Sequence, residues 1–316
     1  MHSFSESSLD DLMRGAIETL ISSGDHTSPT KGPARELRGV TLELTNPRAR
    51  LSRSETRGRV FSCIAELCWY LSRSDRVEPI QFYLSHYRDC AEADGSVHGA
   101  YGPRLFAFDG ADQVQLVIAT LKRRPFSRQA VIQIFDHEDL LEPYKHVPCT
   151  CLLQFFVRSE RLEAVTYMRS NDAYLGLPHD VFAFTMLQEL IARSLDVDLG
   201  AYVHMIGSLH VYESDVANAQ AFLDEGWQSA IEMPVMPLGD PWPSVDTLVT
   251  TEKALRNGND PLGLDFDGDP YWQDLARLLA IFRLHVARRD SDVAGLRAGV
   301  SSAIYDVFLA DRFGPE

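Results

Sequence analysis

A cysteine at the start of a predicted strand is the first candidate for chemistry in this chain. Cys149 follows Val147-Pro148, and the residue pattern after it predicts a strand over 149–157. A thiolate exposed at such a strand end can attack electrophilic carbon. A half-buried structural cysteine is the alternative interpretation, and we expect the neighbouring Cys151 to belong to the core.

An acidic side chain interrupts a predicted apolar helix. Apolar residues recur at helical spacing over 57–72, and Glu66 lies among them. A buried carboxyl group is costly unless it is paired or functional. A raised pKa would suit this group to proton transfer, so Glu66 is a candidate catalytic acid or base.

Further polar residues stand where later elements end or begin. Arg169 and Ser170 follow a predicted strand over 162–168 and offer a guanidinium and a hydroxyl to a phosphate group. Asp180 stands where a predicted helix over 181–195 begins. Capping that helix competes with ligand binding as the role of Asp180.

Two more polar side chains alternate on one face of a predicted strand over 202–212. These are His210 and Tyr212, which could bind a sugar hydroxyl. Taken singly, each is more typical of a polar residue at a sheet edge whose hydrogen bonds are made within the protein.

The elements that must position these residues are strands and helices without strict alternation. Residues 158–161 predict a hairpin turn, and the polar residues 24–38 predict a mobile loop. The order of the elements predicts an α+β layered domain. Helices are predicted for residues 9–21, 57–72, 111–123, 181–195, 271–289 and 293–309, and strands for 40–44, 130–135, 149–157, 162–168 and 202–212.

The charge balance excludes one class of partner. The 316 residues include 30 basic and 45 acidic side chains, which argues against nonspecific binding to nucleic acid polymers. A few arginines can still form a local site for a small anion. No apolar run approaches the length of a membrane span. The five cysteines have no metal-ligand spacing, so we expect a reduced, cytoplasmic protein without a metal site.

Taken together, these segments resemble the thymidylate synthase family. Their order and spacing agree with that family from residue 57 to 213, and the agreement before residue 57 is loose. Residues 214–316 are expected to form a divergent, mostly helical region of the same single domain, 1–316. The matching stretches are Ala65-Glu66-Leu67-Cys68-Trp69-Tyr70-Leu71, Tyr101-Gly102, Ser127-Arg128, Pro148-Cys149, Gln154-Phe155, Arg169-Ser170-Asn171-Asp172, Leu175-Gly176-Leu177-Pro178 and His210-Val211-Tyr212.

The resemblance implies a three-layer fold with a large bent mixed sheet flanked by helices. It also implies a homodimer in which Arg128 of one subunit reaches the nucleotide of the other. Cys149 would attack C6 of a pyrimidine nucleotide, and C5 would then take a one-carbon unit from the co-substrate 5,10-methylenetetrahydrofolate. Glu66 would organise water and move protons, with Tyr101 beside it in the catalytic group.

The resemblance assigns the remaining site residues to the two ligands. Arg169, Ser170 and Arg128 would hold the nucleotide phosphate, with Arg35 or Arg38 in the predicted loop as a further contact. His210 and Tyr212 would bind the sugar 3′-hydroxyl. The folate would be bound by Asp172, Gly176 and Tyr87.

One departure from the family concerns the base. Methylating members carry Asn where this chain has Asp180. Uracil offers an N3–H donor and an O4 acceptor, which an amide matches. Cytosine offers an N3 acceptor and an N4 amino donor, which a carboxylic acid matches. Cytidylate hydroxymethylases of the family resemble this chain in carrying Asp at this position.

Other departures concern the fate of the carbon on C5. Tyr87 and Cys90 stand near the usual tryptophans, Thr150 replaces a histidine, and Gln129 replaces a second phosphate arginine. The usual lid sequence is not visible in residues 311–316. A wetter site would let water add to the C5 methylene and give a hydroxymethyl product.

The sequence therefore predicts a C5 hydroxymethylase of CMP or dCMP. The arginine-rich composition favours CMP as part of specialised nucleoside biosynthesis, whereas Ser170 favours dCMP. A methylating enzyme acting on a uridine nucleotide and a catalytically silent nucleotide-binding homologue are the alternatives.

Overall fold

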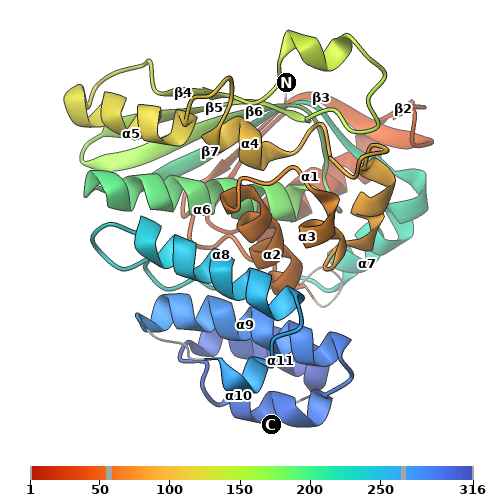
Figure 1. Cartoon of the computed structure of the whole chain (residues 1–316). Coiled ribbons are helices and arrows are strands. Elements are labelled where there is room, and N and C mark those ends of the chain that lie inside the picture. The colour runs from red at the N-terminus through yellow and green to blue at the C-terminus, as the bar shows by residue number, and fades with distance from the viewer. Residues whose placement is uncertain (1, 55–58, 265–267, 315–316) are drawn as a thin grey trace.

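A mixed sheet forms one side of the molecule (Figure 1). The computed structural model describes residues 2–54, 59–264 and 268–314. The strand order is β1-β3-β7-β6-β5-β4, with β2 paired to β3; β1 with β3 and β6 with β7 run parallel, and the other pairs are antiparallel. The strands are β1 (His2–Glu6), β2 (Asp25–Thr27), β3 (Ala34–Leu44), β4 (Val131–Gln133), β5 (Thr150–Arg158), β6 (Arg161–Asp172) and β7 (Asp198–Tyr212).

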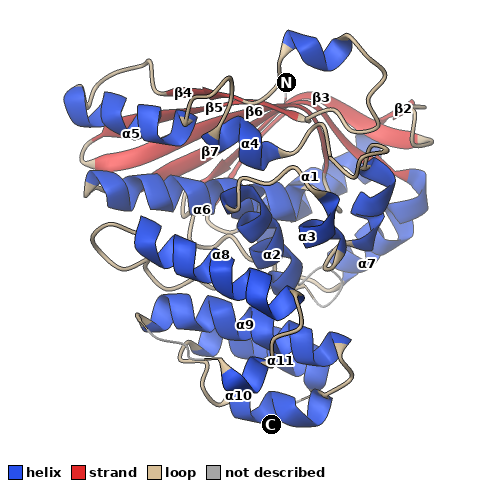
Figure 2. Cartoon of the chain, in the orientation of Figure 1, coloured by secondary structure: helices blue, strands red, loops and turns tan. Residues whose placement is uncertain are grey.

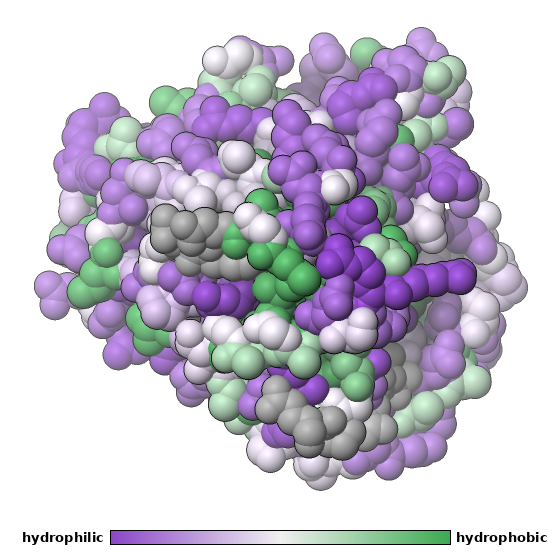
Figure 3. Space-filling view, turned by 60° about the horizontal axis from the view of Figure 1, so that its bottom comes forward, coloured by the Kyte–Doolittle hydropathy of each residue, from purple (hydrophilic) through white to green (hydrophobic). Residues whose placement is uncertain are grey.

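The larger helices lie on one side of this sheet (Figure 2). Helices α1 and α6 pack against it, α2 and α8 lie beyond α6, and α9 to α11 are farthest away, with the C-terminus. The outer face of these last helices is mostly hydrophilic (Figure 3). The helices are α1 (Leu9–Ser23), α2 (Val60–Leu71), α3 (Val77–Gln81), α4 (Tyr101–Phe106), α5 (Gln113–Arg123), α6 (Leu177–Leu195), α7 (Val216–Asp224), α8 (Trp242–Arg256), α9 (Pro270–Val286), α10 (Val293–Arg297) and α11 (Asp306–Phe313).

This architecture confirms the expected α+β fold, with a mixed sheet flanked by helices. The predicted hairpin is also confirmed, since β5 and β6 pair directly through residues 158–161. The helical character expected for residues after 213 is confirmed by α7 to α11. Within the described ranges, no helix is both long and apolar enough to cross a membrane.

The sheet bends where three neighbouring strands change their buried face. Successive residues of a strand point to opposite sides, so buried residues normally lie two apart. In β3, β7 and β6, two successive buried residues lie three positions apart, and these positions are paired across the three strands. Gly39, between the two buried residues of β3, has a φ of 65°. The pairs are Leu37 and Val40, Ile206 and Leu209, and Met168 and Asn171. The bend therefore falls at Arg169 and Ser170, two of the candidate site residues.

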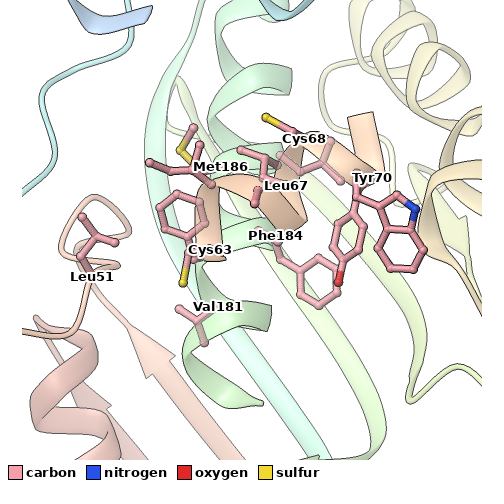
Figure 4. Packing of buried hydrophobic residues seen from close by; sticks show 14 of the residues in the cluster. Leu51, Cys63, Leu67, Cys68, Tyr70, Val181, Phe184 and Met186 are labelled. Atoms are coloured by element: carbon pink, nitrogen blue, oxygen red, sulfur yellow. The ribbon is translucent and has the colours of Figure 1, made fainter. Parts of the chain in front are cut away.

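Helix α2 lies at the centre of the fold because it is apolar on nearly every side. All of its residues from Val60 to Leu71 are buried, including Glu66. A helix that is apolar all round must be covered on all faces. Figure 4 shows α2 residues Cys63, Leu67 and Tyr70 beside the α6 residue Phe184, and α8 and α9 contact α2 as well.

The prediction of a mobile loop over 24–38 is wrong. Residues 25–27 form β2, which pairs with β3 from Ala34 onward, so only residues 28–33 connect the two strands. Both Arg35 and Arg38 therefore lie on a strand. Pairing of β3 with β7 outweighs the polar composition that suggested a loop, since the backbone hydrogen bonds of a sheet do not depend on side-chain polarity.

Other boundaries also differ from the sequence prediction. β6 continues to Asp172, so Arg169 and Ser170 lie within it, and β7 already begins at Asp198. The strand expected over 130–135 is limited to β4, and α2 begins at Val60, with 57–58 lying outside the described residues. The single helix expected over 293–309 is divided into α10 and α11. The backbone N–H groups of Ser301 and Ser302 donate to the Asp274 carboxylate at 2.7 and 2.9 Å, which stabilises the break between the two helices.

A buried ion pair joins the segment before α2 to α6. Arg50 and Glu189 are both fully buried, and the Arg50 guanidinium donates to Glu189 Oε2 at 2.5 Å. The other Glu189 oxygen accepts the backbone N–H of Met236 at 3.1 Å. Removing one member of such a pair leaves the other charge buried without compensation.

We expect Arg50→Met to lower the free energy of unfolding by about 3–5 kcal/mol, because Glu189 would remain buried and unpaired. The double variant Arg50→Met/Glu189→Gln should recover part of this loss, since no buried charge remains. Urea denaturation followed by circular dichroism measures both. Equal stability of the single variant and the unmodified protein would contradict this account.

Candidate active site

The arginine after the bend holds the segment that carries Cys149. The backbone N–H of Arg169 donates to the Cys149 carbonyl oxygen at 2.8 Å. Its guanidinium donates to the carbonyl oxygens of Pro148 at 2.9 Å and Val147 at 3.1 Å. Burial raises the pKa of the half-buried Cys149 thiol, the positive charge of Arg169 opposes that rise, and Asp180 adds to it. The thiolate therefore depends on nearby positive charge.

A lysine that the sequence analysis did not select contributes to this positive charge. Lys31, in the connection between β2 and β3, lowers the pKa of Cys149 and of His146 through its charge. It follows Pro29 in a turn closed by a hydrogen bond from Gly32 N–H to the Pro29 carbonyl at 3.0 Å. The Pro-Thr-Lys-Gly sequence was the available signal, because it marks a tight turn with a cation at its tip.

The arginines expected to share the phosphate are engaged elsewhere. Arg38 is exposed and forms a 3.3 Å ion pair with Asp25. Arg35 pairs with Glu213 at 3.2 Å and also donates to the Ile21 carbonyl. Lys31, rather than Arg38, is thus the cation of this region whose charge acts on the pKa of Cys149.

Asp180 is not the N-cap of α6. Gly176 occupies the cap position, and Asp180 lies in the first turn with its backbone N–H bonded to the Gly176 carbonyl at 3.1 Å. Its side chain accepts a 2.8 Å hydrogen bond from Asn171 Nδ2. Burial raises the pKa of Asp180 well above its usual range, and the charge of Glu66 raises it further. Both effects favour the neutral acid relative to an exposed aspartate.

Glu66 is the second acid of the site and is 5% exposed. Its Oε1 accepts hydrogen bonds from the hydroxyls of Tyr87 at 2.6 Å and Tyr70 at 3.0 Å. Burial raises the pKa of Glu66, and the two hydroxyls act against that rise. Tyr87, predicted only to face the folate, thus also contacts the proton-transfer candidate.

Tyr101, at the start of α4, links this acid to the strand that follows the nucleophile. Its ring centroid lies 5.1 Å from that of Tyr70. Its hydroxyl oxygen accepts from the backbone N–H of Thr150 at 3.2 Å and from the Thr150 hydroxyl at 3.0 Å. Burial raises the pKa of Tyr101 well above its usual range, with Asp180 and Cys149 adding to the rise. Tyr101 therefore lies among the candidate catalytic residues.

The polar residues of β6 and β7 form a second group. Ser170 Oγ lies 3.5 Å from His210 Nδ1, and the His210 ring packs edge-on against Tyr212 with centroids 5.0 Å apart. Asp172 is the strand partner of His210. It also accepts the backbone N–H groups of Tyr174 and Leu175 at 2.8 and 2.7 Å, so it shapes the turn that leads to Gly176.

Arg128 is not brought to these residues within its own chain. It is exposed in the connection between α5 and β4, where its backbone carbonyl accepts from Gln154 Nε2 at 2.8 Å. The structure thus joins Cys149, Arg169, Asp180, Glu66, Tyr87 and Tyr101 in one network and leaves Arg38 and Arg128 apart from it.

This arrangement suits addition of a thiolate to an anionic ligand that also exchanges protons. Arg169 and Lys31 supply positive charge at the nucleophile, while Asp180 and Glu66 supply acids whose pKa values are raised. No three His, Cys, Asp or Glu side chains in the described part of the chain are placed to hold a metal ion.

Two known proteins are similar to this chain in sequence. A deoxyuridylate hydroxymethyltransferase of Bacillus phage SP01 is 31% identical over 233 residues, which cover 68% of this chain and 60% of that protein. A thymidylate synthase of Mycoplasma pneumoniae is 33% identical over 124 residues, which cover 39% of this chain and 43% of that protein. The chain thus spans less than two thirds of the length of either relative.

A family model extends the match further along the chain. The model of thymidylate synthase matches residues 43–250, so the similarity reaches beyond 57–213 at both ends. It includes α2, the bent parts of β6 and β7, and α6, which position the network around Cys149. The chain belongs to the thymidylate synthase family.

Proposed function

We propose that this protein hydroxymethylates C5 of a cytidine monophosphate nucleotide, CMP or dCMP, with 5,10-methylenetetrahydrofolate and water. The observation that carries the proposal is Asp180, a carboxyl group whose surroundings favour the neutral acid. Methylating members of the family have an amide at this position. A neutral acid presents one donor and one acceptor, which match N3 and the N4 amino group of cytosine.

The residues around Cys149 suit the first covalent step. The sulfur forms a bond to C6 of the base, and C5 gains the electron pair of the C5–C6 double bond. Asp180 donates a hydrogen bond at N3 and so withdraws electron density from the ring. Arg169 and Lys31, whose charges stabilise the thiolate, would also hold the nucleotide phosphate, together with Ser170. His210 and Tyr212 would hold the sugar.

The residues around Glu66 suit the later steps. Methylenetetrahydrofolate would supply the one-carbon unit, and Asp172, Gly176 and Tyr87 would face it. C5 loses its proton, tetrahydrofolate leaves, and a water oxygen adds to the C5 methylene before the sulfur departs from C6. Glu66 and the hydroxyls of Tyr70 and Tyr87 form a polar group able to order that water and accept its proton.

Water addition leaves the transferred carbon at its original oxidation level, whereas methylation requires a hydride. The relative from phage SP01 is named a hydroxymethyltransferase, which supports the hydroxymethyl product. The names of the two relatives refer to thymidylate and deoxyuridylate. The proposal of a cytidine base therefore depends on Asp180 alone.

The open face of the sheet supports a homodimer. Val131, Tyr167 and Met205 are 41%, 40% and 41% exposed, and Tyr167 and Met205 are strand partners. A sheet face with exposed apolar residues is typical of an interface. A second copy on this face would bring Arg128 of the partner subunit to the phosphate. Cysteines that are not joined in disulfides suit a reducing compartment, and we propose the cytoplasm.

We expect Asp180→Asn to lower the ratio of cytidine to uridine activity by about 100-fold, because two buried hydrogen-bonding positions become mismatched. The variant should stay folded, since a neutral amide replaces an acid that favours its neutral form. Mass spectrometry of products from CMP, dCMP, UMP and dUMP measures the change and also separates ribose from deoxyribose preference. A uridine-only product from the unmodified protein would overturn the proposed substrate.

Cys149→Ala should reduce release of tritium from the C5 position of the nucleotide by at least about 10⁴-fold, because the covalent bond to C6 cannot form. Cys151→Ala is the matched control and should retain activity. Undiminished exchange in Cys149→Ala would show that another group is the nucleophile.

Tyr167→Arg should convert the dimer to a monomer, because a charge would face the partner on the apolar sheet face. Light scattering after size-exclusion chromatography measures this change.

Mixing inactive Cys149→Ala and Arg128→Ala proteins should restore about a quarter of the unmodified activity, since half of the dimers are mixed and each has one intact site. No recovery on mixing would argue against sharing of Arg128.

A further inference from the structure

Asn171 lies directly behind the carboxyl group that would read the base. It follows the bend on β6 and is 3% exposed. Its Nδ2 lies 2.8 Å from Asp180 Oδ2, 2.9 Å from the Met168 sulfur and 3.5 Å from His204 Nε2. Asn171 is the only side chain of the described residues with a hydrogen bond to the Asp180 carboxyl group.

A neutral carboxylic acid does not by itself distinguish cytosine from uracil. Its proton can reside on either oxygen, so the same group can present donor and acceptor in either order. Cytosine and uracil require opposite orders at N3 and at the exocyclic position. Discrimination therefore needs a second group that fixes the proton to one oxygen.

The Asn171 amide has the geometry to fix it. Nδ2–H donates to Oδ2, and a carbonyl oxygen accepts such a bond better than a hydroxyl oxygen does, so the contact favours placing the proton of the neutral acid on Oδ1. The orientation of the amide follows from its other neighbour. The Met168 sulfur is a weak acceptor, so it suits the NH₂ group and would repel the carbonyl oxygen.

No other described group near Asp180 has the charge and position to fix its proton as Asn171 does. The described ionisable groups that interact electrostatically with Asp180 include no cation. They are Glu66, Tyr70, Tyr87, Tyr101, Cys149 and Tyr202. Burial lowers the pKa of His204 to about 3, so this histidine is neutral. Its Nδ1 lies 2.6 Å from the Tyr202 hydroxyl, which orients the ring.

We propose that Asn171 is a positioning residue that determines base specificity by making Oδ2 of Asp180 the preferred acceptor. This inference rests on the proposed function. Oδ2 then accepts from the N4 amino group of cytosine, and Oδ1–H donates to N3. Uracil would place its O4 against Oδ2 and its N3–H against Oδ1–H, so both contacts would be repulsive.

The test compares Asn171→Leu with the unmodified protein, because leucine has a similar shape and no hydrogen-bonding group. The kcat/KM for tritium release is measured with CMP, dCMP, UMP and dUMP. We expect the ratio of cytidine to uridine activity to fall at least about tenfold, the effect of one lost buried hydrogen bond to a charged or acidic group. Uridine activity should rise, since the proton of Asp180 becomes free to change oxygen.

Two further variants separate specificity from damage to the fold. Thr185→Val, on α6 like Asp180, removes a buried hydroxyl that bonds only to the backbone carbonyls of Val181 and Phe182 and should leave the ratio unchanged. If Asn171→Leu does not fold, Asn171→Ala provides the same comparison. A proportional loss of both activities would show a merely structural role and overturn the proposal.

The outcomes also distinguish this inference from the proposed function. A uridine preference in the unmodified protein would overturn the cytidine substrate and with it the direction assigned to Asp180. A cytidine preference that persists in Asn171→Leu would overturn the role of Asn171 alone.

Discussion

The burial of two carboxyl groups beside one nucleophile is the constraint on which this site depends. Both groups are desolvated, which raises the pKa of each, and the charge of Glu66 raises the pKa of Asp180 further. Hydrogen bonds orient the two carboxyl groups. Tyr70 and Tyr87 orient Glu66, and Asn171 orients Asp180.

The scaffold meets this constraint by covering the helix that carries one acid. Because α2 is apolar on nearly every side, Glu66 is desolvated only if α6, α8 and α9 all pack around it. The C-terminal helices thus have a structural role at the site without supplying a residue to it. The bend in the sheet then places Arg169 and Ser170 opposite the two acids' helices.

The positive charge is confined to the edge of this neutral centre. The chain as a whole has a formal charge of −15, yet Arg169 and Lys31 both lower the pKa of Cys149. An anion that binds these cations would remove part of the charge that stabilises the thiolate, so ligand binding and nucleophile activation are electrostatically linked.

The sequence by itself determined the layered α+β fold, the apolar helix around Glu66 and the candidates Cys149, Arg169 and Asp180, because periodicity and residue type report local burial and chemistry. Only the tertiary structure selected Lys31 over Arg38, extended β3 to Ala34 and divided the last helix at Ser301 and Ser302. It also placed Asn171 behind Asp180. Each of these outcomes depends on pairing between strands or on side chains brought together by the bend, and no local pattern records which partner a folded chain will supply.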